Sequence, residues 1–189
     1  MPDRIYTRRG DDGTTQLLFG GKDRLPKSDP RPSAYGEVDE SVAALGVARA
    51  EAHVAGEDEL AELILRVQRE LFVVGAELAT APDDWERLTP GVSQVTQEMV
   101  DRLETDIDSL RSRFEMPKDF VVAGETRLGA ALDLARAVLR RAERAVVRLS
   151  LAEPVRGEVL AYVNRLADLA WAMERFAERS ERQPRPREG

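Results

Sequence analysis

The stretch "DLARAVLRRAERAVVRL" (residues 133–149) decides the fold of this chain, because its apolar residues recur every three or four positions. At about 100° per residue, such a repeat gathers one broad apolar side on a helix. That side contains Leu128, Ala131, Leu132, Ala135, Val138, Leu139, Ala142, Val146 and Leu149. The sequence therefore predicts a long amphipathic helix from about Thr126 to Leu151.

The charges of this helix form a pattern of their own. Arg136, Arg140 and Glu143 share one edge beside the apolar side, at the spacing i, i+4, i+7. Guanidinium groups one turn apart repel each other unless an anion lies near them. Glu143 can orient them, and a phosphate chain suits the paired donors of arginine. The alternative is a solvated face with weak Glu–Arg pairs. The arginines expected to point the opposite way, toward solvent, are Arg141, Arg144 and Arg148.

The rest of the chain predicts four more helices, over about 33–53, 58–78, 93–113 and 154–179. Ser33 would cap the first, Asp58 opens the second, and Pro154 starts the last in its first turn. The segments TAPDDWERLTPG and FEMPKDFVVAGET have the prolines and glycines of loops. No stretch has a convincing strand pattern. We expect one all-α domain: an arm over 1–32, a five-helix bundle over 33–180 and a disordered tail over 181–189.

Composition excludes several classes of site and partner. With 189 residues the chain can bury one good core. It has no cysteine and a single histidine, His53, so disulfides, thiol catalysis and multi-histidine metal sites are excluded; we expect His53 on the surface. The net charge of −7 disfavours nucleic acid and anionic membranes. No apolar run resembles a signal or membrane span, so we expect a cytoplasmic protein.

The N-terminal segment TRRGDDGTT (residues 7–15) has the residue types of an anion cradle. Gly10 and Gly13 let successive backbone N–H groups turn toward one anion, and Thr14 and Thr15 can donate hydrogen bonds to phosphate. Asp11 or its neighbour Asp12 could hold Mg²⁺ directly or through water. The carriers of further positive charge are Lys22 and Lys27. The alternative is a plain turn, because Gly, Asp and Thr cluster in turns generally. The arm is expected to order on binding.

The last helix adds one polar position among apolar neighbours. Asn164 follows Val163 and precedes Arg165 and Leu166 in "YVNRLADLAW". An amide in such surroundings needs hydrogen-bond partners. A nucleotide could supply them, and a contact between helices or plain exposure is the alternative.

Three segments together carry a family resemblance: "TRRGDDGTT…KSDPR…AYGEVDE", "FVVAGETRLGAALDLARAVLRRAER" and "YVNRLADLAWAMER". In this order and spacing the chain resembles the PduO-type ATP:cob(I)alamin adenosyltransferases over nearly its whole length. The resemblance implies a five-helix bundle that assembles as a homotrimer, with ATP and the corrinoid bound between subunits. It also implies transfer of the 5′-deoxyadenosyl group from ATP to cob(I)alamin, with release of triphosphate. The site would use ATP with Mg²⁺, and cobalamin as substrate.

The resemblance also implies roles for individual residues. Asp39 would pair with Arg136 of the next subunit near the site, and Phe120 would stand beneath the corrin and keep the lower axial ligand off cobalt. The residues implied to contact ATP are Thr7, Gly10, Asp11, Gly13, Thr14, Thr15, Lys27, Arg140, Glu143 and Asn164. No protein side chain needs activation as a nucleophile, because Co(I) is itself the nucleophile. A reductase that supplies Co(I) and a cobalamin-dependent enzyme that uses the product are the partners such chemistry calls for.

The chain departs from the family pattern at several positions. Ala123, Gly124 and Glu125 stand where Pro-Gly-Gly is usual, and Asp133 stands where a histidine is usual. The other departures are Arg9, Ser41, Ala170 and Glu174. Because Glu125 and Asp133 add negative charge close to an anion site, two alternatives stay open. One is a diverged paralogue that binds nucleotide or corrinoid as a carrier or sensor, and the other is a purely structural helical oligomer.

Overall fold

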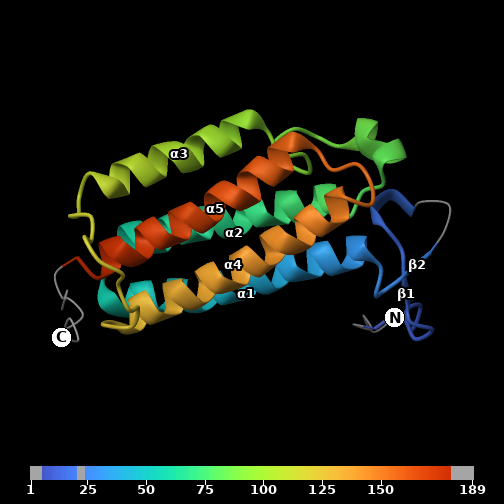
Figure 1. Cartoon of the computed structure of the whole chain (residues 1–189). Helices are drawn as coiled ribbons and strands as arrows, with labels where there is room; N and C mark the ends of the chain where they lie inside the picture. Colours follow the sequence, from blue (N-terminus) through green and yellow to red (C-terminus); the bar gives the residue numbers. More distant parts are fainter. Residues whose placement is uncertain (1–5, 21–23, 180–189) are drawn as a thin grey trace.

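A computed structural model describes residues 6–20 and 24–179. Over these residues the chain forms five α-helices with two short 3-10 helices and a two-stranded sheet (Figure 1). The α-helices are α1 (Pro30–Ala55), α2 (Asp58–Leu78), α3 (Gln97–Arg111), α4 (Arg127–Ser150) and α5 (Gly157–Ala177). The smaller elements are β1 (Thr14–Thr15), η1 (Leu18–Gly20), β2 (Leu25–Pro26) and η2 (Pro82–Arg87). The predicted all-α bundle is confirmed.

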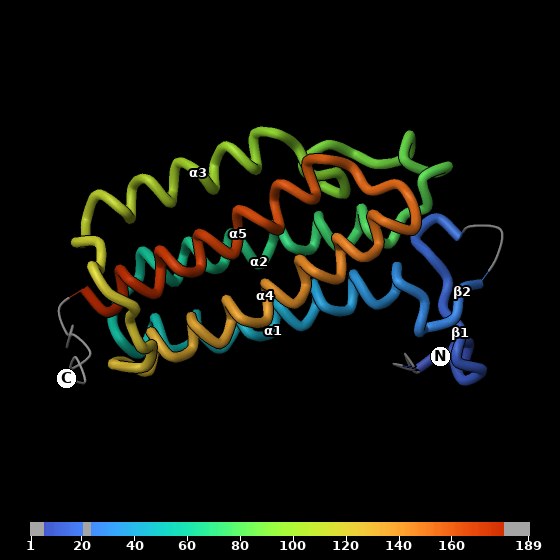
Figure 2. The backbone as a smooth tube through the Cα atoms, viewed as in Figure 1, coloured from blue at the N-terminus to red at the C-terminus, as the bar shows by residue number. Residues whose placement is uncertain are grey.

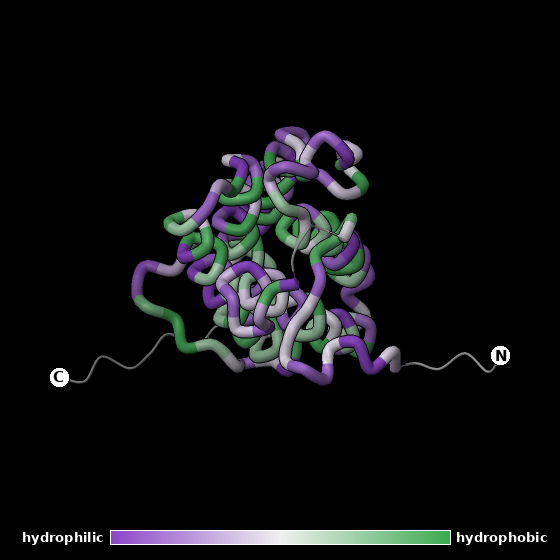
Figure 3. Tube along the Cα trace, turned by 90° about the vertical axis from the view of Figure 1, so that its right-hand side faces the viewer, coloured by the Kyte–Doolittle hydropathy of each residue, from purple (hydrophilic) through white to green (hydrophobic). Residues whose placement is uncertain are grey.

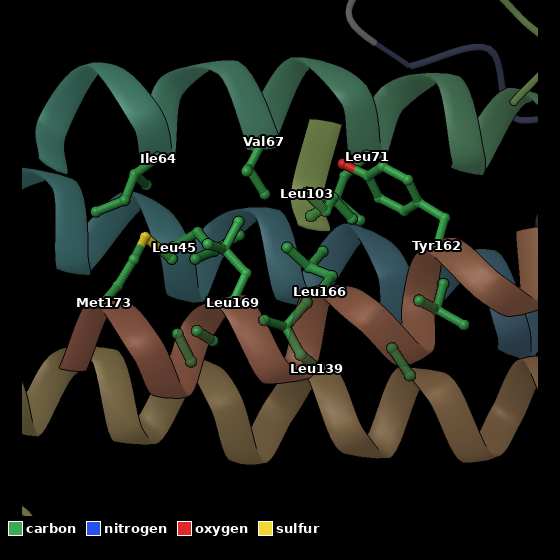
Figure 4. Packing of buried hydrophobic residues seen from close by; sticks show 14 of the residues in the cluster. Leu45, Ile64, Val67, Leu71, Leu103, Leu139, Tyr162, Leu166, Leu169 and Met173 are labelled. Carbon is green, nitrogen blue, oxygen red and sulfur yellow. The ribbon is translucent and has the colours of Figure 1, made fainter. Parts of the chain in front are cut away.

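Each long helix runs antiparallel to its sequence neighbours, and together the helices form one bundle (Figure 1). Helix α1 packs against both α2 and α4, while α5 packs against α4 and carries α3 on its outer side (Figure 1). All five helices contribute to one core, in which Leu45, Leu71, Leu103, Leu139 and Leu166 are buried (Figure 4). Hydrophobic and hydrophilic positions alternate along the turns of the helices (Figure 3). Within the described residues, no helix is long and apolar enough to cross a membrane.

Helix α4 forms where its pattern predicted it. Thr126 caps the helix, since its Oγ1 accepts a hydrogen bond of 2.8 Å from the backbone N–H of Gly129. The residues of the predicted apolar side are all buried. Removing such a set of aliphatic side chains from water stabilises the bundle by about 25 cal/mol for each Å² buried. This side therefore faces α1 and α5, and the charged edge is left at the margin.

The starts of three helices differ from the prediction. Helix α1 begins at Pro30 rather than Ser33, because the Asp29 carboxylate accepts from the Arg31 N–H at 2.9 Å and proline suits the first turn. Helix α1 therefore includes residues 30–32, which the sequence had assigned to the arm. Helix α3 begins at Gln97, and Ser93 instead closes a turn by accepting from the N–H of Thr89. Helix α5 begins at Gly157 rather than Pro154.

The arm contains a small sheet that the sequence did not predict. Strands β1 and β2 pair antiparallel, with Thr14 opposite Pro26 and Thr15 opposite Leu25. Beyond them, the N–H of Leu18 donates to the carbonyl of Ala79 at the end of α2, at 2.8 Å. The arm is therefore a hairpin attached to one end of the bundle (Figure 2). Its ordering on binding stays a prediction, and the predicted disordered tail lies outside the described residues.

Arg31 joins the root of this hairpin to the bundle. It is 2% exposed, and its Nη1 donates to the carbonyls of Leu78 and Thr80 at 2.8 and 2.9 Å. Its guanidinium also forms an ion pair of 2.7 Å with Glu153, in the turn between α4 and α5. One buried side chain thus provides hydrogen bonds to two buried carbonyls at the C-terminal end of α2. It joins the start of α1, the end of α2 and the turn between α4 and α5.

Candidate functional site

The exposed edge of α4 meets α5 through a polar contact. Asn164 donates from its side-chain amide to Glu143 at 3.0 Å, so the contact between helices is the one this amide makes. Arg140 lies one turn before Glu143 and is exposed. Among the described residues, Arg140 has no hydrogen bond or ion pair, which leaves its five N–H donors available to a ligand.

Arg136 is held by carboxylates of its own chain. Its Nε and Nη2 donate to Asp133 at 3.0 and 2.8 Å, and Glu174 of α5 lies 3.9 Å from Nε. Asp133, rather than the predicted Glu143, therefore orients this arginine. Burial raises the pKa of Glu174, partly offset by Arg175 and reinforced by Asp133. Asp133, which stands where the resemblance implies a histidine, thus provides an internal counter-ion for Arg136.

One arginine of α4 was misassigned from the sequence. Arg141 was expected to point to solvent, but its Nε donates to Glu37 of α1 at 2.6 Å, and Nη2 pairs with Glu40. The hydrogen bonds to Glu40 and Glu37 raise the pKa of the Arg141 guanidinium. The helical wheel could not indicate this pairing, because it depends on which neighbour covers α4. Arg144 and Arg148 are exposed, as predicted.

Phe120 lies in the long connection between α3 and α4. Its side chain is 93% exposed, in a loop that also presents Val121 and Val122 to solvent. The loop borders a cavity of about 470 Å³ between α4 and α5. This cavity is lined by Phe120 together with Arg136, Trp171 and Glu174. The structure therefore brings two of the predicted site residues, Phe120 and Arg136, to one cavity.

The hairpin brings the predicted arm residues together. Lys27 donates from Nζ to the carbonyl of Gly10 at 2.8 Å, and its backbone N–H donates to Gly13 at 2.9 Å. Gly13 has φ 78°, a conformation that favours glycine. A Cβ at Gly10 would lie 3.1 Å from Lys27 Nζ. Arm and lysine thus form one compact unit.

Arg24 is a hairpin residue that the sequence did not single out. Its Nε donates to the Thr14 hydroxyl at 2.6 Å and its Nη2 to the Arg9 carbonyl at 2.6 Å. Asp12 accepts from the N–H and the hydroxyl of Thr14 at 2.9 and 2.7 Å, and these bonds lower its pKa. A lone arginine in a loop gives no periodic signal, so only the fold reveals this cluster.

Asp39 lies on another part of the surface. It is exposed and borders a mostly apolar cavity of about 400 Å³ between α1 and α2, together with Leu18 and Phe72. Among the described residues, no ion pair joins Asp39 to Arg136, and no hydrogen bond joins the hairpin to Arg140. The predicted residues therefore form separate groups within one chain: the hairpin, Asp39, and the edge of α4 and α5 with Phe120.

Metal-binding capacity is limited. Among residues 6–20 and 24–179, no group of three or more His, Cys, Asp or Glu side chains is arranged to hold a metal ion. The Asp11 carboxylate is exposed beside the Gly10 turn. Mg²⁺ commonly takes only one or two carboxylates and completes its shell with phosphate and water.

The chain was compared with families and proteins of known activity. The family model described as cobalamin adenosyltransferase matches residues 5–177. A corrinoid adenosyltransferase of Citrobacter freundii is 40% identical over 175 residues, which is 93% of this chain and 95% of the relative. A corrinoid adenosyltransferase of Bacillus subtilis is 35% identical over 173 residues, 91% of this chain and 85% of the relative.

Solved structures of corrinoid adenosyltransferases resemble the fold of this chain. One is a variant of the PduO-type ATP:corrinoid adenosyltransferase from Lactobacillus reuteri complexed with cobalamin and ATP. It superposes with a TM-score of 0.83 at 37% identity, and the match covers 96% of this chain and 97% of that chain. A second variant of that enzyme, complexed with ATP, has a TM-score of 0.80 at 34% identity and covers 95% of this chain and 97% of that chain.

Proposed function

This chain belongs to the cobalamin adenosyltransferase family, and we propose on that premise that it transfers the 5′-deoxyadenosyl group of ATP to cob(I)alamin. The products are adenosylcobalamin and triphosphate. The named relatives are adenosyltransferases, which favours the enzyme over a diverged nucleotide or corrinoid binder and over a structural oligomer. Phe120 and Arg136 beside one cavity, with the unpartnered Arg140 one turn away, is the observation that carries the proposal.

The proposed site combines residues of two subunits. In one chain the hairpin lies at the N-terminal end of α1, while the Phe120 loop lies at the C-terminal end of α5 (Figure 1). The 24 residues of α4 run between these ends, about 36 Å at 1.5 Å per residue. A cobalt that lies above Phe120 and an ATP wrapped by the hairpin of the same chain would therefore be too far apart for attack on C5′. A homotrimer in which the hairpin and Asp39 of one copy face Arg136, Arg140 and Phe120 of the next would complete each site.

The reaction requires positioning and charge stabilisation rather than a protein nucleophile. The Co(I) of the substrate attacks C5′, a cobalt–carbon bond forms, and the bond from C5′ to the triphosphate oxygen breaks. Both electrons of the new bond come from Co(I), and triphosphate leaves with those of the broken bond. The catalytic contribution of the chain is to hold C5′ in line with cobalt and to neutralise the departing phosphates.

Each group of residues then has a distinct task. Arg140 would donate two N–H bonds to phosphate, a geometry that only its planar guanidinium offers. Glu143 and Asn164, already joined at 3.0 Å, would present a fixed pair of polar groups to the nucleotide. The turn at Gly10 and Gly13, with Lys27 and the hydroxyls of Thr7, Thr14 and Thr15, would wrap the remaining phosphates.

Phe120 would act on the corrinoid without binding cobalt. An apolar ring beneath the corrin takes up the space of the lower axial ligand, and loss of that ligand makes reduction of Co(II) to Co(I) easier. The 93% exposure of the ring is consistent with a side chain that meets a ligand rather than the core. A reductase is needed to supply the electron, and a cobalamin-dependent enzyme would use the product; both partners, and a cytoplasmic location, are part of the proposal.

Mg²⁺ would accompany ATP. Asp11 would hold the ion, directly or through water, beside the phosphates of the hairpin-bound nucleotide. The ion would supply further neutralisation of the triphosphate. The exposed position of the Asp11 carboxylate leaves it free for this task, whereas Asp12 is engaged by Thr14.

An anaerobic assay tests the activity directly. Purified protein is mixed with ATP, Mg²⁺ and chemically reduced cobalamin, and a light-sensitive adenosyl–cobalt product and free triphosphate are measured. We expect equimolar amounts of both. ATP binding without product would contradict the proposal and favour a binder, and no binding of either ligand would favour a structural oligomer.

Mixing two variants tests whether the site is shared. Asp39→Asn and Arg136→Ala are each expected to lower turnover. After the two proteins are mixed, unfolded and refolded together, some interfaces combine an intact Asp39 with an intact Arg136. We expect part of the activity to return in this mixture. Activity that stays at the level of the separate variants would contradict the shared site.

A further inference from the structure

The carboxylate of Glu178 grips the far end of the Phe120 loop. Its Oε1 accepts backbone hydrogen bonds from three successive residues, Gly124, Glu125 and Thr126, at 3.1, 3.0 and 3.4 Å. Its Oε2 accepts from Arg175 at 3.0 Å. The Glu178 side chain is 1% exposed. A buried charge costs several kcal/mol unless it is paired and hydrogen-bonded, and this carboxylate has partners on both oxygens.

The helix opposite leaves room for this grip. At Gly129, in the first turn of α4, an added Cβ would lie 2.1 Å from Glu178 Oε1 and 2.6 Å from its carboxylate carbon. Such a contact is impossible without moving the side chain. Glycine costs roughly 1 kcal/mol relative to alanine within a helix. The absence of a side chain at this position is therefore what lets the carboxylate enter between α4 and the loop.

The other end of the loop begins near Phe114. At that end, Arg111 donates to the carbonyl of Phe114 at 3.2 Å, and the Phe114 ring packs edge-on against Trp171 at 6.2 Å. Among the described residues, no hydrogen bond or ion pair involves 115–123. In Figure 2 the connection between α3 and α4 crosses the C-terminal end of α5, where Glu178 lies. Phe120 therefore hangs between two anchors.

We propose that Glu178 is a positioning residue for Phe120: it fixes the end of the loop from which the ring projects toward the corrin. This inference rests on the proposed function for its catalytic meaning, although the grip itself does not. Glu178 touches neither substrate in this scheme. It acts through residues 124–126, only four positions from Phe120, so its loss should affect handling of the corrinoid and spare handling of ATP.

Two variants perturb the grip by independent routes. Glu178→Gln keeps the size of the side chain but removes its charge and sets an amide donor against Arg175. Gly129→Ala does not alter Glu178 itself, but its added Cβ would lie 2.1 Å from Glu178 Oε1 and so displaces the carboxylate. Alanine is itself favourable in a helix. If one variant fails to fold, the other decides the matter.

Matched controls lie at the other end of α5. Glu158 forms a more exposed ion pair with Arg156 at 2.9 Å, so Glu158→Gln removes the same charge from the same helix, away from the loop. An added Cβ at Gly157 meets no atom within 4 Å, so Gly157→Ala makes the same substitution without a clash. We expect both controls to behave as the unaltered protein.

The readouts separate a positioning role from a structural one. In both variants, amide hydrogen exchange of residues 124–126, whose N–H groups donate to Glu178, should accelerate roughly tenfold, the effect of losing charge-assisted hydrogen bonds. The KM for cobalamin should rise on the order of tenfold, with the KM for ATP unchanged. The spectrum of bound Co(II) should also retain more of the signal of a corrinoid whose lower ligand is attached, as it should in Phe120→Ala.

Three results would overturn the proposal. Exchange of 124–126 that stays unchanged in both variants would mean that Glu178 does not hold the loop. A lower melting temperature with both KM values unchanged, or an equal rise of both, would mean a merely structural role. If the unaltered protein forms no adenosyl–cobalt product, the proposed function fails, whereas the exchange measurement still decides whether Glu178 anchors the loop.

Discussion

Replacing Arg140 by alanine should weaken ATP use without weakening the fold. The side chain is exposed and has no partner among the described residues, so its removal should change the free energy of unfolding by less than about 0.5 kcal/mol. A charge-assisted hydrogen bond to phosphate contributes about 1.5–3 kcal/mol. Since about 1.4 kcal/mol is a factor of ten, kcat/KM for ATP should fall roughly 10- to 150-fold.

The assay is steady-state adenosylation at varied ATP with saturating cob(I)alamin, together with thermal unfolding of each variant. Arg144 is the matched control, because it is exposed on the same helix one turn further on; Arg144→Ala should leave kcat/KM unchanged. Arg140→Lys should lie between the two, since it keeps the charge but loses the planar pair of donors. Equal kinetics for Arg140→Ala and the unaltered protein, or equal losses at both positions, would refute the assignment.

Further predictions concern the rest of the molecule. Asp39→Asn and Arg136→Ala should each lower kcat more than they raise the KM for ATP, because they act on the geometry of the shared site; unchanged kcat values in both would remove that pair from it. Burial raises the pKa of Glu174, so its ionisation disfavours the folded state, and the stability it contributes at low pH is lost as pH rises from about 4.5 through its folded pKa. Glu174→Gln should therefore flatten the fall in melting temperature between mildly acid and neutral pH, and an unaltered slope in calorimetry would count against this. The Tyr162 hydroxyl donates to the buried carboxylate of Glu70 at 2.8 Å, so Tyr162→Phe should lower the free energy of unfolding in urea by about 1–3 kcal/mol; a loss near zero would mean that water replaces the hydroxyl.

The sequence predicted the fold best where local and tertiary signals agree. Helix α4 has a cap at Thr126 and an apolar side of more than six turns, so its bounds were predicted to within one residue. The start of helix α1 was predicted three residues too late, because Ser33 and Asp29 are both possible caps. Asp29 is the cap because Pro30 follows it. The hairpin strands have two residues each, which is too few for a period-two pattern to appear.

The candidate site could be predicted by residue type but not by partner. The spacing of Arg136, Arg140 and Glu143 placed them correctly on one edge of a helix. Which carboxylate orients Arg136 depends on how α4 and α5 pack, and Asp133 and Glu174 emerged only from the fold. The same holds for Glu178, whose three backbone partners lie more than 50 positions earlier in the chain.

The space beside Gly129, which the Glu178 carboxylate fills, limits which residue pairs related sequences can have at these two positions. The Glu178 carboxylate occupies the volume that a side chain at position 129 would need, so any side chain at position 129 must displace it. Across related sequences, an alanine at position 129 should therefore be accompanied by a shorter residue at position 178. The residues at these two positions, 49 apart in the chain, would then vary together, because their side chains compete for the same space.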